Sequence, residues 1–333
     1  MAPADAKETQ KVLWLQGRGS NAKEVIHKWV PKLMGSPNYF AHSTNCAEEE
    51  KFVSWALNGL FNYRDYDMEN CKYFLMWSTD PIASNRQQPN AIDRWGQVMD
   101  AAHIVVIDPR FSTTAAKADK WLPIIPGTDG ALAVAIAHEI LVSGKWNKDF
   151  VGDFKDGLWN YDESGFYDKN VNLFRKGEEV DEERFEYKNA YGLVRWWNLE
   201  LKDKDAEWAA PICGIDAKDI KSVAKDFAKY GTGACSWVSP GTTNQARGAY
   251  GAMAAEALNG LVGSYQNKGG SQVSASVSTA PAPDHRQYRD KLAKTYEKKP
   301  SADPGHTKEF LAAKDGKIDN QHITNRVPEL ILE

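Results

Sequence analysis

The 333-residue sequence has few cysteines and no long hydrophobic run, and both shortages limit what the protein can be. Its four cysteines include no C-x-x-C pair, which argues against a zinc site or an iron–sulfur cluster built from neighbouring cysteines. The longest apolar stretches, such as residues 131–137, are far shorter than the roughly 20 residues that cross a bilayer, so no membrane insertion is predicted. Residues 1–10 lack the apolar core of a secretion signal, and we expect any export signal to lie outside this chain.

An excess of charge of one sign is also missing. The 41 lysines and arginines nearly balance the 45 aspartates and glutamates, giving a formal net charge of -4. This balance offers no electrostatic reason to expect nucleic acid as a partner. The glycine patterns G-x-G-x-x-G and G-x-x-x-x-G-K-[ST] are absent too, which disfavours an ordinary nicotinamide-dependent dehydrogenase and a P-loop enzyme.

Short apolar runs that are followed by turns and helical patterns indicate the fold. Continuous rather than alternating hydrophobicity is typical of parallel strands covered on both faces. We therefore predict an α/β protein with mostly parallel sheets, and its length favours two lobes. The predicted strands are 11–16, 73–77, 103–107 and 234–238, with an edge strand at 120–125, and the predicted helices include 131–142, 216–229 and 248–262.

Polar segments follow several predicted strands, at the sheet edge where open α/β proteins bind ligands. Asp108 has the position of a ribose- or base-binding carboxylate, and residues 127–129 begin a helix whose free amides suit a polar or anionic group. By themselves these features indicate a nucleotide-like ligand only weakly. The alternative is a turn aspartate and an ordinary helix cap.

Cys46 precedes a predicted helix that residues 43–45 can cap. A thiol near a helix start ionises more readily, and a thiolate is a good ligand for a soft metal. The acidic residues 48–50 oppose that ionisation, and most lone cysteines are small buried hydrophobes. Spacing alone leaves both interpretations of Cys46 open.

Several spaced motifs lie in order between about Val12 and Ser276, at residues 77–84, 106–116, 118–132, 241–245, 258–263 and 268–270. Together they resemble the motifs of the molybdopterin oxidoreductases, the dimethyl sulfoxide reductase family. That resemblance implies that both lobes are doubly wound. It implies molybdenum held between two pterins as bis-molybdopterin guanine dinucleotide. It also implies that Cys46 completes the coordination of the metal.

The resemblance also implies which residues bind the cofactor and how the chain is divided. The residues expected at one guanosine end are Trp77, Ser78, Thr79, Asp80, Ser84, Asp108, Arg110, Gly127, Thr128 and Asp129, while Gly241, Asn244 and Gln245 are expected to serve a second domain. We expect residues 1–45 to begin one cofactor domain, 46–230 to form the other, and 231–333 to return to the first with a polar tail from about 271. Residues 145–203 are expected to be a surface excursion.

Residues 35–39, 42–48, 62–67 and 80–87 are most similar to respiratory arsenate reductases. The resemblance places Arg18, His42, Lys51 and Tyr63 in the oxyanion pocket beside the metal, and it implies that the molybdenum centre reduces arsenate to arsenite by oxygen-atom transfer while these side chains bind the oxyanion. Each of the four also has an ordinary structural interpretation. Relatives acting on thiosulfate, polysulfide, tetrathionate or selenate are an alternative, and a non-catalytic nucleotide-binding or scaffold remnant is an alternative of another class.

The resemblance further implies a periplasmic enzyme of anaerobic respiration whose partner is an iron–sulfur electron-transfer subunit. A 4Fe-4S cluster is expected in an N-terminal region and a barrel in a C-terminal region, and neither is found in this sequence. We therefore expect the chain to be the central part of a catalytic subunit, incomplete at both ends and inactive alone.

Overall fold

The computed structural model describes residues 14–17, 39–41, 46–84, 88–155, 172–186, 192–246 and 248–274. The chain divides into two compact units, Met1–Glu48 with Ser276–Glu333, and Glu49–Ala275. The described strands are β1 (Trp14–Gln16), β2 (Tyr39–Ala41), β3 (Arg64–Tyr66), β4 (Tyr73–Trp77), β5 (His103–Ile107), β6 (Lys120–Leu122), β7 (Ala234–Val238) and β8 (Ser271–Val273). The described helices are α3 (Glu48–Asn58), α4 (Gln88–Ala101), η2 (Ala115–Lys117), α5 (Asp129–Val142), α6 (Lys148–Val151), η3 (Glu182–Arg184), α7 (Leu193–Trp196), η4 (Trp197–Leu201), α8 (Ala206–Cys213), α9 (Ala217–Tyr230), η5 (Gly231–Gly233), α10 (Pro240–Thr243) and α11 (Gly248–Leu261).

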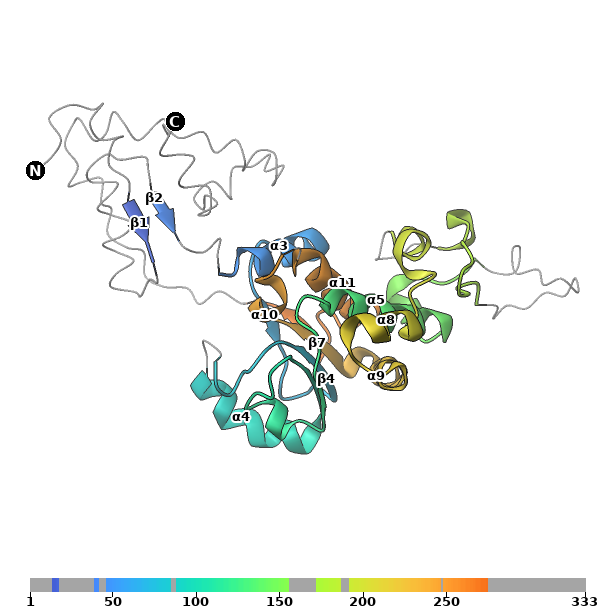
Figure 1. Cartoon of the computed structure of the whole chain (residues 1–333). Coiled ribbons are helices and arrows are strands. Elements are labelled where there is room, and N and C mark those ends of the chain that lie inside the picture. Colours follow the sequence, from blue (N-terminus) through green and yellow to red (C-terminus); the bar gives the residue numbers. More distant parts are fainter. Residues whose placement is uncertain are drawn as a thin grey trace, which may run out of the picture. The chain divides into compact units, whose positions relative to one another are not determined.

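A four-stranded parallel sheet in the order β6-β5-β4-β7 forms the centre of the second unit (Figure 1). All five residues of β4 and of β7 are buried, as expected for strands covered on both faces. The strands predicted at 73–77, 103–107 and 234–238 are confirmed residue for residue, and the predicted edge strand is the shorter β6.

Helices cover both faces of this sheet and create two hydrophobic cores. On one face, alternate residues such as Phe74 and Met76 pack against Trp95 and Val98 of α4. On the other face, the side chains of α5, α8, α9 and α11 surround Leu75 and the rest of a larger core. Figure 1 shows α4 and α9 on different sides of the strands. The result is a three-layer α/β/α arrangement.

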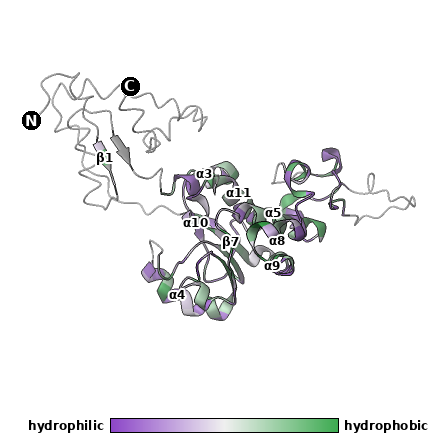
Figure 2. Cartoon of the chain, in the orientation of Figure 1, coloured by the Kyte–Doolittle hydropathy of each residue, from purple (hydrophilic) through white to green (hydrophobic). Residues whose placement is uncertain are grey.

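Residue spacing explains how each helix packs. In α9, Ile220, Val223 and Phe227 recur at helical spacing and are buried, whereas the rest of the helix is largely charged. Helix α5 is apolar around most of its circumference because it lies between other helices and the sheet, and Figure 2 shows its hydrophobic character. Gly130 and Gly251 let α5 and α11 approach closely, since a Cβ added to Gly130 would lie 3.2 Å from Gly251 Cα.

Two of our predictions about organisation are wrong. Residues 231–274 do not leave the lobe formed by the preceding residues, because β7 is hydrogen-bonded to β4 over its whole length. Residues 145–203 are not only a surface excursion. Within the described part of that segment, aromatic rings pack into the larger core, with centroids 5.1 to 6.4 Å apart; they are Trp146, Phe154, Phe174, Phe185 and Trp197.

The first unit contains a parallel pair of three-residue strands, in which Trp14 of β1 lies opposite Tyr39 of β2. Strand β1 confirms the end of the strand that we predicted at 11–16. None of the described helices has the length and apolar content needed to span a membrane.

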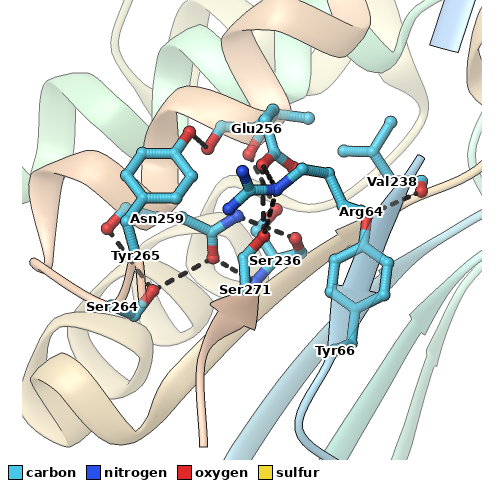
Figure 3. Close-up of polar contacts among 10 residues, drawn as sticks. Arg64, Tyr66, Ser236, Val238, Glu256, Asn259, Ser264, Tyr265 and Ser271 are labelled. Atoms are coloured by element: carbon cyan, nitrogen blue, oxygen red, sulfur yellow. Dashed lines mark hydrogen bonds and ion pairs between the residues drawn. The ribbon is translucent and has the colours of Figure 1, made fainter. Parts of the chain in front are cut away.

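A buried polar network fixes the antiparallel pair of β3 and β8 to α11 (Figure 3). Arg64 Nε donates to Ser271 Oγ at 3.1 Å and lies 3.7 Å from Glu256 Oε1. Ser271 Oγ also donates to Glu256 at 3.3 Å. Beside this ion pair, Asn259 and Ser236 exchange two hydrogen bonds and so join α11 to β7. Burial raises the pKa of the Glu256 carboxyl to about 7, and the Arg64 guanidinium opposes that rise.

Glu256 should make stability depend on pH. Its folded-state pKa lies above its ordinary value near 4.5, so the folded protein binds the extra proton and the carboxyl favours folding most below that value. The free energy of unfolding should therefore fall, by at most about 3 kcal/mol, as pH rises from the ordinary pKa of 4.5 to the folded-state pKa of about 7. Urea unfolding of wild type and Glu256→Gln between pH 4.5 and 8 tests this. We expect a flatter profile for the variant, and parallel profiles would contradict the assignment.

Candidate functional site

The carboxyl ends of the four parallel strands bring together residues from segments far apart in the sequence. The chain adds β5 and β6 on one side of β4, then crosses the opposite face and adds β7 on the other side. This reversal of strand order is a topological switch point, the place where open α/β sheets bind ligands. We call the segments 78–84, 108–114, 126–130 and 239–245 at this edge the edge site.

Hydrogen bonds join the segments after β4 and β7 at the switch point. Ser239 Oγ donates to Ser78 O at 2.8 Å, and Thr242 Oγ1 donates to Trp77 O at 3.2 Å. Ser78 has a positive φ of 47°, which is uncommon for a residue with a side chain. Gly241 packs directly on it, since a Cβ at Gly241 would lie 2.5 Å from Ser78 O. Only glycine fits this approach.

Asp80 connects the segments after β4 and β5. Its buried carboxylate accepts hydrogen bonds from Thr114 N at 3.1 Å and from Thr114 Oγ1 at 2.6 Å. Its second oxygen accepts from Arg110 Nη2 at 3.3 Å. Asp80 therefore orients Arg110, whose side chain is 71% exposed and can reach an anion.

Asp108 lies at the end of β5, where the sequence predicts it. One carboxylate oxygen accepts from Arg110 N at 2.8 Å, and the Asp108 carbonyl accepts from Trp121 Nε1 at 2.8 Å. The ring of Phe111 is 60% exposed and packs edge-on against Trp121, with centroids 4.9 Å apart. These contacts hold a largely buried carboxylate and an exposed aromatic ring close together in the segment after β5.

Asp129 begins α5 and is 3% exposed. Its Oδ2 accepts from Gln245 Nε2 at 2.8 Å, while the buried Oδ1 accepts no hydrogen bond from another residue in the described part of the chain. Gln245 Nε2 also donates to Thr242 O at 2.9 Å, so the segment after β7 fixes this carboxylate. A buried acceptor without a partner calls for a donor from a ligand or from water.

The edge site gathers carboxylates whose charges act on one another. Burial raises the pKa of Asp129, and the charge of Asp108 adds to that rise while the Gln245 hydrogen bond opposes it. Burial likewise raises the pKa of Asp108, with Arg110 opposing and Asp80 adding. A ligand with N–H or O–H donors would stabilise the buried charges of Asp108 and Asp129 by hydrogen bonding to them. The exposed Arg110 guanidinium would bind an anionic part of the same ligand.

The structure separates the other predicted edge residues by role. The Trp77 side chain is fully buried and its Nε1 donates to Ser236 Oγ at 2.8 Å, so only its backbone reaches the edge. Thr128 Oγ1 donates to Ile125 O at 2.6 Å instead of capping α5. Gly127 takes a positive φ of 85° in that turn. Thr79 is buried, whereas Ser84 and Asn244 are exposed.

We expected Gly241, Asn244 and Gln245 to serve a second domain. The structure places them in the same lobe as Asp108, because β7 lies beside β4. They share one edge with Asp108 and Asp129. Sequence reasoning also missed Thr114, Trp121, Ser239 and Thr242, which orient the carboxylates and join the segments. Their signal is weak, because hydroxyl residues in turns are common and nothing local identifies their distant partners.

Helix α3 and the turn before it contain two of the residues predicted to bind the metal or the oxyanion. Cys46 is half-buried and forms with Ala47 the turn that leads into the helix, close to the predicted start. Lys51 lies in the first turn of α3, and its Nζ is 5.2 Å from the ring centroid of Tyr63. The other two predicted oxyanion donors, Arg18 and His42, lie outside the described residues.

A parallel sheet with partly satisfied carboxylates and an exposed arginine at a switch point is typical of α/β proteins that bind nucleotide-like ligands. The family model for the molybdopterin oxidoreductases matches residues 11–323. The chain therefore belongs to the molybdopterin oxidoreductase family, as the motifs predicted, and the family implies a molybdenum and pterin cofactor.

The chain is similar to arsenate respiratory reductase molybdopterin-containing subunits (ArrA). It is 42% identical to that of Chrysiogenes arsenatis over 98% of this chain and 37% of the relative, and 42% identical to that of Shewanella sp. strain ANA-3 over 96% and 36%. It thus spans little more than a third of these relatives. Acetylene hydratase from Pelobacter acetylenicus has a similar fold, with a TM-score of 0.58 and 19% identity over 81% of this chain and 33% of that one.

The residues of the edge site fit a polar part of such a cofactor. Asp108 and the Asp129 oxygen that has no partner in the described part of the chain offer acceptors to N–H or O–H donors, and Arg110 offers donors to an anion. In the described part of the chain, no three histidine, cysteine or acidic side chains gather as a metal site.

Gly241→Ala should disrupt the edge site. The added methyl group would meet Ser78 O at 2.5 Å and force the two segments apart, at a cost of about 1–3 kcal/mol. The matched control is Gly96→Ala on the exposed face of α4, where nothing lies within 4 Å of the new Cβ. We expect the control to be neutral or slightly stabilising. Denaturant unfolding measures both, and equal stability of the two variants would contradict the close contact.

Proposed function

We propose that this chain is the central part of the catalytic subunit of a molybdenum-dependent oxyanion reductase that converts arsenate to arsenite. The observation that carries the proposal is the 42% identity to two arsenate respiratory reductase subunits along nearly the whole chain. The edge site also supports the proposal, because its buried carboxylates and exposed arginine suit a nucleotide-bearing cofactor.

In this proposal the cofactor is bis-molybdopterin guanine dinucleotide, and the edge site holds one guanosine end. Asp108 and Asp129 accept hydrogen bonds from base or ribose donors, and Arg110 donates to an anionic group. Gly127, Gly241 and Asn244 bring backbone close to the ligand. Since Gln245 orients Asp129, the segment after β7 serves the same guanosine as the segments after β4 and β5.

Cys46 is the proposed protein ligand of the metal, through its thiolate. A soft thiolate suits a metal that already has sulfur ligands. When bound, the molybdenum–pterin centre supplies two-electron oxygen-atom-transfer chemistry.

The proposed oxyanion donors are Arg18, His42, Lys51 and Tyr63. Arg18 gives two parallel donors and Lys51 gives a compact positive charge, so both offset the negative charge that builds on the oxygens. Release of one arsenate oxygen as water consumes two electrons and two protons. Tyr63 and His42 have the hydroxyl and ring N–H that can donate hydrogen bonds or protons to that oxygen.

The remaining parts of the proposal concern the intact enzyme. An iron–sulfur subunit delivers electrons, a 4Fe-4S cluster and a C-terminal barrel are supplied by regions outside this chain, and the enzyme works in the periplasm. Other oxyanions remain a second candidate because the chain is also 22% identical, over 79% of its length, to a selenate reductase of Mesobacillus selenatarsenatis. Relative rates with arsenate and selenate discriminate the two.

Cys46→Ala is the decisive test of this function. We expect the intact wild-type enzyme that contains this chain to hold close to one molybdenum per catalytic subunit and to reduce arsenate. We expect the variant to lose at least about 100-fold of that activity, roughly the scale of losing an essential group. The control is Cys213→Ala, which alters a thiol buried in the core and should stay active. Only trace molybdenum in wild type would favour the non-catalytic scaffold, and equal activity of Cys46→Ala would show that another residue binds the metal.

Asp129→Asn tests whether the edge site binds the guanosine end of the cofactor. The variant keeps the shape of the side chain but loses a charged acceptor, so guanine nucleotide should bind about 10- to 100-fold more weakly. The measurement is guanine nucleotide released by denaturation, per purified chain. The control is Asp219→Asn on α9, where the aspartate pairs with Lys120 at the surface. Equal guanine content in all three proteins would show that Asp129 does not bind the guanosine.

A further inference from the structure

The ammonium group of Lys51 lies over two aromatic rings. Lys51 Nζ is 5.8 Å from the ring centroid of Phe61 and 5.2 Å from that of Tyr63. Both distances are within the range at which the negative face of an aromatic ring attracts a cation. All three side chains are half-buried, so the attraction acts in surroundings that are partly shielded from water.

The backbone that follows α3 explains how the rings come to face the helix. The helix ends at Asn58, and Gly59 turns the chain with a positive φ of 72° while its N–H donates to Trp55 O. Asn62 then accepts a hydrogen bond from Tyr63 N through its side chain at 2.9 Å. The next residue is Arg64, which the buried network with Glu256 and Ser271 holds in β3. The two rings therefore extend from a segment that is fixed at both ends.

An aromatic face attracts an ammonium group through the negative potential of the ring, and so helps to fix where that group lies. A lysine side chain also has about 2 kcal/mol of rotamer entropy to lose when it is held in place. A lysine that is already held loses less of this entropy when an anion binds, and the anion binds more tightly.

We infer that Phe61 is a positioning residue that, together with Tyr63, holds the Lys51 ammonium ready for the oxyanion. The inference rests on the proposed function, in which Lys51 contacts the substrate. Phe61 touches neither substrate nor metal in this account, and it acts only through the placement of Lys51.

The experiment compares Phe61→Leu with Phe61→Tyr and with the control Phe52→Leu in the molybdenum-loaded enzyme that contains this chain. Phe52 lies on the same helix as Lys51, and its ring packs against Trp55. We expect Phe61→Leu to raise the KM for arsenate roughly threefold to tenfold with little change in kcat. Phe61→Tyr keeps the aromatic face and should restore the wild-type KM, and Phe52→Leu should leave it unchanged.

A second readout does not require activity. Reductive methylation of the purified protein, followed by mass spectrometry, gives the modification rate of Lys51. We expect Phe61→Leu to raise this rate severalfold because the ring no longer holds and covers the ammonium, while Phe52→Leu should not. Should Phe61→Leu fail to fold, Phe61→Met replaces it in both measurements.

The results separate the two proposals. If Lys51→Met leaves the KM for arsenate unchanged, Lys51 does not contact the substrate and that part of the proposed function fails. If Lys51→Met raises the KM while the Phe61 variants match wild type in KM and in modification rate, the positioning role is wrong. Equal effects of Phe61→Leu and Phe52→Leu would also overturn it, because they would reflect a general loss of aromatic packing.

Discussion

The burial of β4 between β5 and β7 is the constraint on which the rest of the structure depends. Five consecutive residues without exposure on either face require a strand partner on each side and a helical layer above and below. Because the three strands are parallel and in register, their carboxyl ends meet at one edge. This brings the segments that contain Asp108, Gly241 and Ser78 to one edge, although they are far apart in the sequence.

Much of the fold could be predicted from local sequence, because continuous apolar runs are unambiguous when a strand is covered on both faces. The position of β7 could not, since no local pattern encodes which strand lies beside which. That gap produced the mistaken boundary near residue 230. The same limit applies to Phe174 and Trp197: aromatics in a charged, weakly periodic segment look like surface residues until a distant core that accepts them is known.

The candidate site was predictable where chain position fixes chemistry. A carboxylate directly after a parallel strand, such as Asp108, or at the first residue of a helix, such as Asp129, reaches the sheet edge whatever surrounds it. The contacts that hold these groups were not predictable, because they join residues that the sequence separates. Thr114 donates a hydrogen bond to Asp80 across 34 residues of sequence, and Gln245 donates one to Asp129 across 116. A side chain can also leave a predicted site, as Trp77 does when its indole donates to Ser236 within the core.

The pairing of β3 with β8 has a consequence for how this unit is made. Arg64 is buried against Ser271 across 207 residues, and β4 pairs with β7 across about 160 residues, since Tyr73 lies opposite Ala234. During synthesis the early strands must remain without these partners until Val273 has left the ribosome. Long-range pairing of this kind is slow and exposes apolar strand edges to other chains. The unit should therefore depend on chaperones during translation more than a domain built from local hairpins does.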